Sequence, residues 1–121
     1  MTITSKVIPV VRIKIAAVQP ARRAEDDREV VGYEAGLAES EVWERGRKAW
    51  KMKADKVLAA ELALISHAGI VRAVGAVSGV SKQGDRLVIE GTVIPEHPLV
   101  GRADPLHNSS QNPVTYGSVS V

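Results

Sequence analysis

Residues 70–94 restrict the fold of this chain more than any other part of the sequence. Residues 70–80 are almost wholly apolar, residues 81–85 are polar and include a glycine, and residues 87–94 return to an alternation of apolar and other side chains. Two β-prone runs separated by such a turn are typical of an antiparallel hairpin. We therefore expect a long β-hairpin here, with Gly75 and Gly79 at places where its first strand bends.

The elements around this hairpin set the order of the fold. Residues 7–17 alternate as a strand would, and residues 114–119 predict one closing strand. Residues 33–45 are rich in Glu, Ala and Leu and predict a helix that Gly46 ends or bends. Apolar residues at helical spacing predict a second helix over residues 54–60, followed by a strand.

This order of one strand, two helices and then several strands is not the alternation that builds a parallel α/β sheet. A chain of 121 residues with 45% hydrophobic and 25% charged residues has the size and composition of one domain. We therefore expect a single α+β domain over residues 1–121, in which a small antiparallel sheet curls into a barrel with two or three helices packed at one side. Residues 19–29 are polar and predict a mobile loop.

Composition narrows the chemistry. The chain has no cysteine, which excludes disulfides and thiolate metal clusters. Its first residues lack the pattern of a secretory signal and no later run has the length of a membrane span, so we expect a cytoplasmic protein that does not contact membranes. Phenylalanine is absent, so the core must be aliphatic and the position of each remaining aromatic is informative. These aromatics are Tyr33, Trp43, Trp50 and Tyr116.

The charge of the sequence changes sign abruptly near residue 45. Residues 25–44 contain eight acidic residues and one basic residue, whereas residues 45–56 contain six basic residues and one acidic residue. Such blocks indicate either two electrostatically distinct surfaces or two ordinary solvated faces.

The basic block holds the strongest candidate for a binding site. Lysine and arginine side chains neutralise phosphates, and an exposed indole offers a face on which a base stacks. The alternative is that the tryptophans anchor the core of a protein without phenylalanine, and this interpretation suits Trp43 better than Trp50. The predicted contacts are Arg45, Arg47, Lys48, Trp50, Lys51 and Lys53.

A second candidate lies just before the predicted closing strand. Gln111 and Asn112 precede Pro113, and amide side chains can read the hydrogen-bonding edge of a base. The alternative is a turn in which Asn112 satisfies neighbouring backbone groups. Ser110 shares either role, so Ser110, Gln111 and Asn112 are taken as candidate contacts.

Signals for catalysis are weak. His67, His97 and His107 lack the i, i+4 spacing of paired metal ligands, and the acidic residues 25–29 fall in the predicted loop. The sequence has no phosphate-binding loop and no dinucleotide fingerprint. We expect neither a metal nor a cofactor, and binding is favoured over catalysis.

Four segments occur in a recognisable order: the strand at residues 10–14, Glu-Arg-Gly-Arg-Lys-Ala-Trp-Lys at residues 44–51, residues 63–74, and Ser-Gln-Asn-Pro-Val-Thr-Tyr at residues 110–116. With this order the chain resembles, over residues 7–116, the small PUA-like domain of bacterial and phage proteins that also occurs attached to GIY-YIG-type nucleases. The resemblance implies a pseudo-barrel related to domains that bind RNA or modified bases. It implies no known reaction, and the chain has no GIY or YIG motif.

Three hypotheses for function follow. The first is a non-catalytic module that binds RNA or DNA, with a modified or flipped base as one form of ligand. The second is a protein-interaction module that docks on a partner protein through its acidic helix or an apolar strand edge. The third is a small nucleotide-directed hydrolase or nuclease that uses a lysine and a carboxylate. A barrel fold alone does not choose among them.

Overall fold

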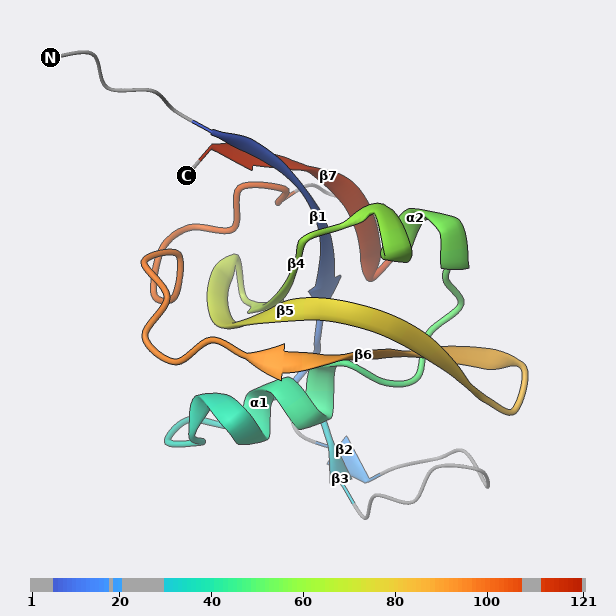
Figure 1. Ribbon diagram of the computed structural model, residues 1–121. Helices are drawn as coiled ribbons and strands as arrows, with labels where there is room; N and C mark the ends of the chain where they lie inside the picture. Colours follow the sequence, from blue (N-terminus) through green and yellow to red (C-terminus); the bar gives the residue numbers. More distant parts are fainter. Residues whose placement is uncertain (1–5, 18, 21–29, 108–111, 121) are drawn as a thin grey trace, which may run out of the picture.

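The protein is built around one five-stranded mixed sheet (Figure 1). The computed structural model describes residues 6–17, 19–20, 30–107 and 112–120. The strand order is β6-β5-β4-β1-β7, and a separate ribbon pairs β2 with β3. The α+β class expected from the sequence is confirmed. The elements are β1 (Val7–Lys14), β2 (Gln19–Pro20), β3 (Val30–Val31), α1 (Glu39–Gly46), α2 (Ala54–Ala59), β4 (Leu62–His67), β5 (Ile70–Gln83), β6 (Arg86–Val93) and β7 (Val114–Ser120).

The predicted hairpin is present as β5 and β6. The two strands pair antiparallel along most of their length, and the register shifts between Val77 and Gly79. This irregularity coincides with the bend expected at Gly79. β4 pairs antiparallel with the other side of β5, so the three strands form a meander.

One strand pair corrects the prediction of a purely antiparallel sheet. β1 pairs with β4 in parallel, with Val10 opposite Leu62 and Ile13 opposite Ile65. Parallel neighbours require a crossover of about a dozen residues or more, and the chain between Lys14 and Leu62, which includes both helices, supplies it. β7 returns antiparallel on the outer side of β1, so the first and last strands lie side by side (Figure 1).

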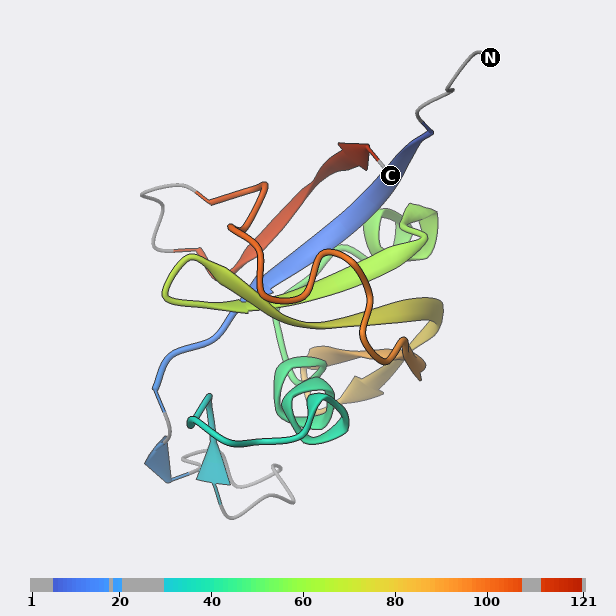
Figure 2. The same ribbon diagram turned by 90° about the vertical axis from the view of Figure 1, so that its left-hand side faces the viewer.

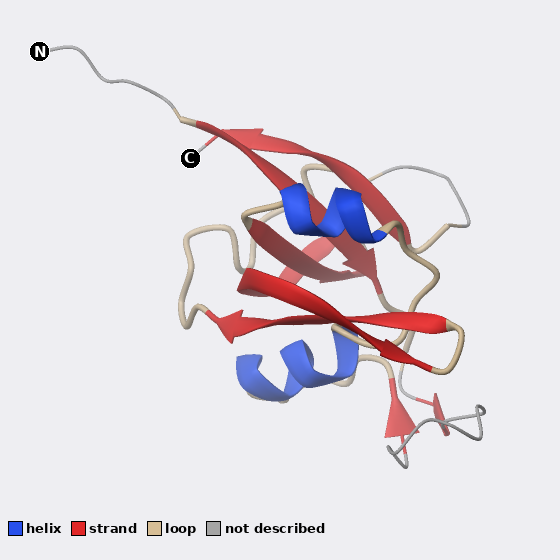
Figure 3. Ribbon diagram, turned by 45° about the vertical axis from the view of Figure 1, so that its right-hand side comes forward, coloured by secondary structure: helices blue, strands red, loops and turns tan. Residues whose placement is uncertain are grey.

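The sheet is open, because its two described edge strands, β6 and β7, do not pair with each other. Strand pairing therefore does not close this sheet into the barrel that the sequence predicts. Two or three helices were expected, and the described residues form two, both of them short. Figure 3 shows them beside the long β5–β6 hairpin.

Each face of the sheet has its own hydrophobic core. On the helix-side face, Val11 and Ile13 of β1 pack in one cluster with Trp43 of α1 and Val57 of α2. Both helices therefore lie on one side of the sheet, as predicted. On the opposite face, a second cluster forms under the segment 94–107, which crosses the sheet in Figure 2. Its buried members are Ile8, Val10, Leu62, Leu64, Val71, Val74 and Val119.

The first helix begins later than predicted. A helix was expected over residues 33–45, but α1 starts at Glu39. Gly36 has a φ of +90°, which a right-handed helix cannot contain, so the chain turns before the helix begins. Of the loop expected at residues 19–29, Gln19 and Pro20 belong to β2, and residues 21–29 lie outside the described residues.

Two glycines allow α1 to lie close against the sheet. Gly46 ends the helix as predicted, and a Cβ there would lie 2.5 Å from the Ile65 side chain. A Cβ on Gly75 of β5 would lie 2.5 Å from the ring of Trp43, which is 3% exposed. Trp43 is therefore the core anchor that the sequence predicts, and it occupies space left by the missing side chain at Gly75.

A buried ion pair joins β1 to the segment 94–107 that crosses the sheet. Arg12 Nε lies 3.2 Å from Asp104 Oδ2, and both side chains are 0% exposed. The Arg12 guanidinium also donates to the carbonyl oxygens of Leu106 and Pro113 and to the hydroxyl of Thr115. The alternation of β1 places Arg12 on the other face of the sheet from Ile13, and the segment 94–107 covers it. This network holds the middle and the end of the connection from β6 to β7 against β1.

Candidate functional site

Residues 50–53, the last part of the segment between the two helices, connect the two edge strands of the open sheet. At one end, Trp50 and Leu87 of β6 exchange two backbone hydrogen bonds of 2.9 Å. At the other end, the backbone N–H of Lys53 donates to the hydroxyl of Tyr116 on β7 at 2.9 Å. We call residues 50–53 the connecting segment, because it spans the gap that the strands leave open.

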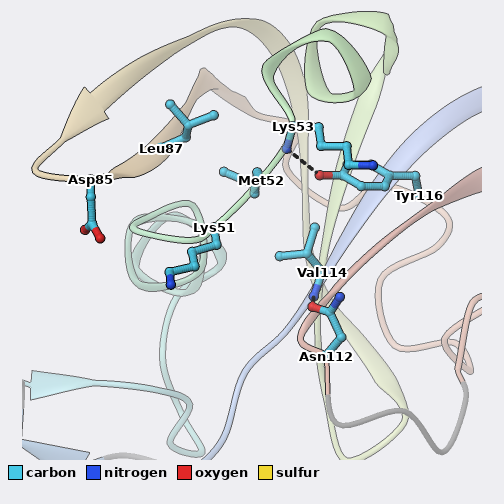
Figure 4. A pocket seen from close by; sticks show the side chains of 8 residues that line it. All are labelled: Lys51, Met52, Lys53, Asp85, Leu87, Asn112, Val114 and Tyr116. Atoms are coloured by element: carbon cyan, nitrogen blue, oxygen red, sulfur yellow. Dashed lines mark hydrogen bonds between the residues drawn. The ribbon is translucent and has the colours of Figure 1, made fainter.

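A cleft of about 370 Å³ lies in this gap (Figure 4). Its volume falls in the range of about 300–1,000 Å³ that is usual for small-ligand sites. The lining comes from the connecting segment, from the β5–β6 turn with the following strand, and from the beginning of β7. The lining residues are Lys51, Met52, Lys53, Asp85, Leu87, Asn112, Val114 and Tyr116.

The lining divides into an apolar floor and a polar rim. Val114 belongs to the helix-side core, and Met52 and Tyr116 pack against that core as half-buried residues. The floor is therefore an extension of the hydrophobic core that reaches solvent. The exposed rim residues are Lys51, Lys53, Asp85 and Asn112.

Lys51 and Lys53 give the rim its positive charge. Both residues are exposed, and within the described part of the chain neither ammonium group has a hydrogen bond or an ion pair. Asp85 supplies the negative charge of the lining, so two lysines against one aspartate leave a formal charge of +1. Cations beside an apolar floor suit a ligand that combines an anionic group with an apolar or aromatic one.

Asn112 forms the corner at the start of β7. Its Oδ1 accepts a hydrogen bond from the Val114 N–H at 3.0 Å, and the Pro113 carbonyl accepts one from the Lys14 N–H at 2.8 Å. The turn that the sequence offers as one interpretation of Asn112 is therefore confirmed. The same side chain also lines the cleft.

Trp50 lies beside the cleft but outside its lining. The residue is half-buried and packs against the helix-side core, and its indole Nε1–H donates to the Gly46 carbonyl at 2.7 Å. This placement fits the core-anchor interpretation of Trp50 rather than the open stacking surface. The physical reason is that a chain without phenylalanine uses its large rings to fill the core.

The two arginines of the basic block are engaged with carboxylates. Arg45 lies 3.3 Å from Glu34 and 3.6 Å from Glu41. Arg47 lies 2.9 Å from Glu44, and its side chain also approaches Glu90 of β6. The acidic and basic blocks therefore offset each other where they meet.

Of the remaining predicted contacts, some lie at the cleft and others do not. Lys48 is half-buried and does not line the cleft. Ser110 and Gln111 lie outside the described residues. Of the predicted set, the structure thus brings Lys51, Lys53 and Asn112 together around one cleft.

The sequence did not predict the other lining residues as ligand contacts; these are Met52, Asp85, Leu87, Val114 and Tyr116. For β7 a signal exists, because Asn112, Val114 and Tyr116 are two residues apart and a strand places such residues on one face. The role of Leu87 has no local signal, since it depends on the connecting segment lying against β6.

Among the described residues, no group of three histidine, aspartate or glutamate side chains is placed to hold a metal ion. No helix in this part of the chain is long and apolar enough to cross a membrane. Comparisons with protein-family models, with curated proteins and with solved structures found no match to this chain. The geometry of the cleft is therefore the basis for a functional proposal.

Proposed function

We propose that the protein binds single-stranded nucleic acid and that the cleft takes one unpaired base of the strand. The observation that carries the proposal is the juxtaposition of two exposed ammonium groups, those of Lys51 and Lys53, with the half-buried ring of Tyr116. A nucleotide has the matching parts, since its phosphate is anionic and its base has a flat apolar face.

In this proposal the two lysines bind phosphates of the strand. Lysine is a flexible point charge, so Lys51 and Lys53 can each follow a phosphate without a fixed geometry. Each phosphate contact releases counterions from the strand, which makes binding depend on salt. The two positions are separated by Met52, whose side chain belongs to the floor.

In this proposal the base stacks on the ring of Tyr116. Stacking of a base on an aromatic side chain is worth about 1–3 kcal/mol. The hydroxyl of Tyr116 accepts the Lys53 N–H, so the ring is held in place before a ligand arrives. A ring that is already ordered loses less conformational freedom on binding, which favours affinity.

The shape of the site favours an unpaired base over a duplex. A base enters a concave cleft only when it is not stacked inside a double helix, and extrusion from a duplex costs a few kcal/mol. A modified or flipped base belongs to the same class of ligand, as does an ordinary base of a single strand.

The PUA-like resemblance of the sequence is part of this proposal. We propose that the open sheet together with the connecting segment forms a PUA-like pseudo-barrel. Support comes from the contacts of the connecting segment, which reaches Leu87 on one edge strand and Tyr116 on the other.

The proposal is tested by fluorescence anisotropy with labelled oligonucleotides of about eight nucleotides, a length within the range that small single-strand-binding domains occupy. Single-stranded RNA, single-stranded DNA and the matching duplexes are compared at low salt. We expect tighter binding of single strands than of duplexes. A plot of the logarithm of the affinity against the logarithm of the salt concentration should have a slope of about −1.4 or steeper, since two phosphate contacts give about −1.4.

Variants assign the binding to the cleft. The double variant Lys51→Gln/Lys53→Gln should lose most of the salt dependence, and Tyr116→Ala should weaken binding about tenfold to a hundredfold through loss of the stack. Lys6→Gln is the matched control, because Lys6 is exposed at the opposite end of β1 from the cleft. The proposal fails if the wild-type protein binds no strand at low salt, or if folded cleft variants bind as the wild type does.

A further inference from the structure

A second group of side chains lies where β1 ends, outside the cleft. The Cζ atom of Arg72 on β5 lies 4.7 Å from the centroid of the Tyr33 ring, and its Nε–H donates to the His67 carbonyl at 3.3 Å. The His67 ring stacks on Tyr33 with centroids 4.9 Å apart and an interplanar angle of 26°. The Nδ1 atom of His67 lies 2.9 Å from the Ile15 carbonyl oxygen. These contacts hold the Arg72 guanidinium between a ring and a carbonyl.

Arg72 differs from the arginines that form ion pairs. Within the described part of the chain it has no carboxylate partner, so an aromatic ring and a neutral carbonyl fix its position while its charge stays uncompensated. The Nε–H is used, and the two terminal amino groups remain for another acceptor. A planar guanidinium fork of this kind matches the oxygens of a phosphate. The ion pairs of the others are Arg12 with Asp104, Arg45 with Glu34 and Glu41, and Arg47 with Glu44 and Glu90.

This group lies on the same face of the sheet as the cleft. His67 continues the alternation of Ala63 and Ile65 on β4, and both of these residues belong to the helix-side core. Val114, at the cleft, belongs to that core as well. The two sites therefore share a face rather than lying on opposite sides of the sheet.

The two sites are also close along that face. Both sites contact the end of β1. At the corner of the cleft, the carbonyl of Pro113, which follows Asn112, accepts the Lys14 N–H. His67 contacts the carbonyl of Ile15, the residue after Lys14. β7 and β4 flank β1 on its two sides. Since adjacent strands are about 4.8 Å apart, the corner of the cleft and His67 are separated by two strand spacings, about 10 Å.

We infer that Arg72, positioned by Tyr33 and His67, binds a backbone phosphate of the same strand whose base occupies the cleft. The inference rests on the proposed function and extends it, because it adds a third cation to the path of the strand and makes binding depend on strand length. A ligand confined to the cleft does not reach Arg72, whereas a longer strand does.

The test compares a labelled dinucleotide with a labelled single strand of about eight nucleotides. Arg72→Gln should weaken binding of the longer strand about tenfold to a hundredfold, the effect of losing one charge-assisted contact, and should reduce its salt slope by about 0.7. Binding of the dinucleotide should stay as in the wild type. Arg72→Lys should keep the salt slope of the longer strand but bind it more weakly, because lysine retains the charge without the fork. Lys6→Gln should behave as the wild type with both ligands.

The outcomes separate this inference from the proposed function. If Arg72→Gln and Arg72→Lys are folded by circular dichroism and bind the longer strand as the wild type does, while Lys51→Gln/Lys53→Gln weakens it, the inference is overturned and the proposed function stands. Equal weakening of the dinucleotide and the longer strand by Arg72→Gln also overturns the inference, since Arg72 would then act on the cleft itself. If the wild-type protein binds neither ligand, both fail.

Discussion

Replacement of Asp104 by asparagine is expected to remove a large fraction of the stability of the protein. Asparagine keeps the shape of the side chain but removes its charge, so the Arg12 guanidinium, which is 0% exposed, is left with neutral acceptors. Breaking a buried ion pair by removing one partner costs about 3–5 kcal/mol. Arg12 keeps its hydrogen bonds to Leu106, Pro113 and Thr115, so we expect the lower end of this range, about 3 kcal/mol.

Urea unfolding followed by circular dichroism measures this loss. With a slope of about 2 kcal/mol per molar urea, a loss of about 3 kcal/mol moves the midpoint down by about 1.5 M. Glu61→Gln is the matched control, because it removes one carboxylate charge from an exposed residue and should change stability by less than about 0.5 kcal/mol.

The double variant Arg12→Met/Asp104→Asn isolates the ion pair from the rest of the network. If the charge of Arg12 makes Asp104→Asn costly, the same substitution should cost less in the Arg12→Met background, by a coupling energy of at least about 0.5 kcal/mol. Additive effects of the two substitutions, or a loss below about 1 kcal/mol for Asp104→Asn alone, would refute the reasoning.

Two further predictions concern the tryptophans. Gly75→Ala should lower the free energy of unfolding by about 1–3 kcal/mol, because the added methyl group meets the Trp43 ring. Gly79→Ala, with open space around it, should stay within about 0.5 kcal/mol of the wild type. Thermal unfolding compares the two variants, and equal effects would contradict the packing argument. Trp50→Phe should lower the free energy of unfolding by about 1 kcal/mol through loss of the hydrogen bond to Gly46, and should leave oligonucleotide affinity unchanged. A tenfold loss of affinity in a folded variant would instead show that the indole contacts the ligand.

The hairpin and the helices could be predicted because their signals are local. The polar run at residues 81–85 marks the end of the hairpin, although only Gly84 and Asp85 form the turn and residues 81–83 continue β5. The spacing of apolar residues after residue 54 predicts α2. The parallel pairing of β1 with β4 has no such signal, since it depends on how the helices pack during the crossover. The late start of α1 depends on one backbone angle at Gly36, which glycine permits without requiring it.

The candidate site was predictable in part for the same reason. A block of lysines is visible in the sequence, but whether each cation is free depends on partners far along the chain. Arg47 shows this, because one of its carboxylate partners, Glu90, is 43 residues away, whereas Lys51 and Lys53 face the cleft. Trp50 was the natural stacking candidate from its neighbours, and only the fold shows its indole hydrogen-bonded to Gly46.

The position of the cleft follows from how the two sheet edges are covered. An edge strand leaves backbone groups unpaired, and on β6 the chain around the connecting segment satisfies several of them, with Trp50 paired to Leu87 and the Arg47 carbonyl accepting the Ile89 N–H. On β7 the connecting segment is joined through a side chain, the Tyr116 hydroxyl, which holds the backbone of Lys53 a ring's length away from the strand. Space remains on that side, and the cleft occupies it. Because Arg12 holds Pro113 and Thr115 on either side of Val114, the ion pair with Asp104 stabilises the wall of the cleft as well as the fold.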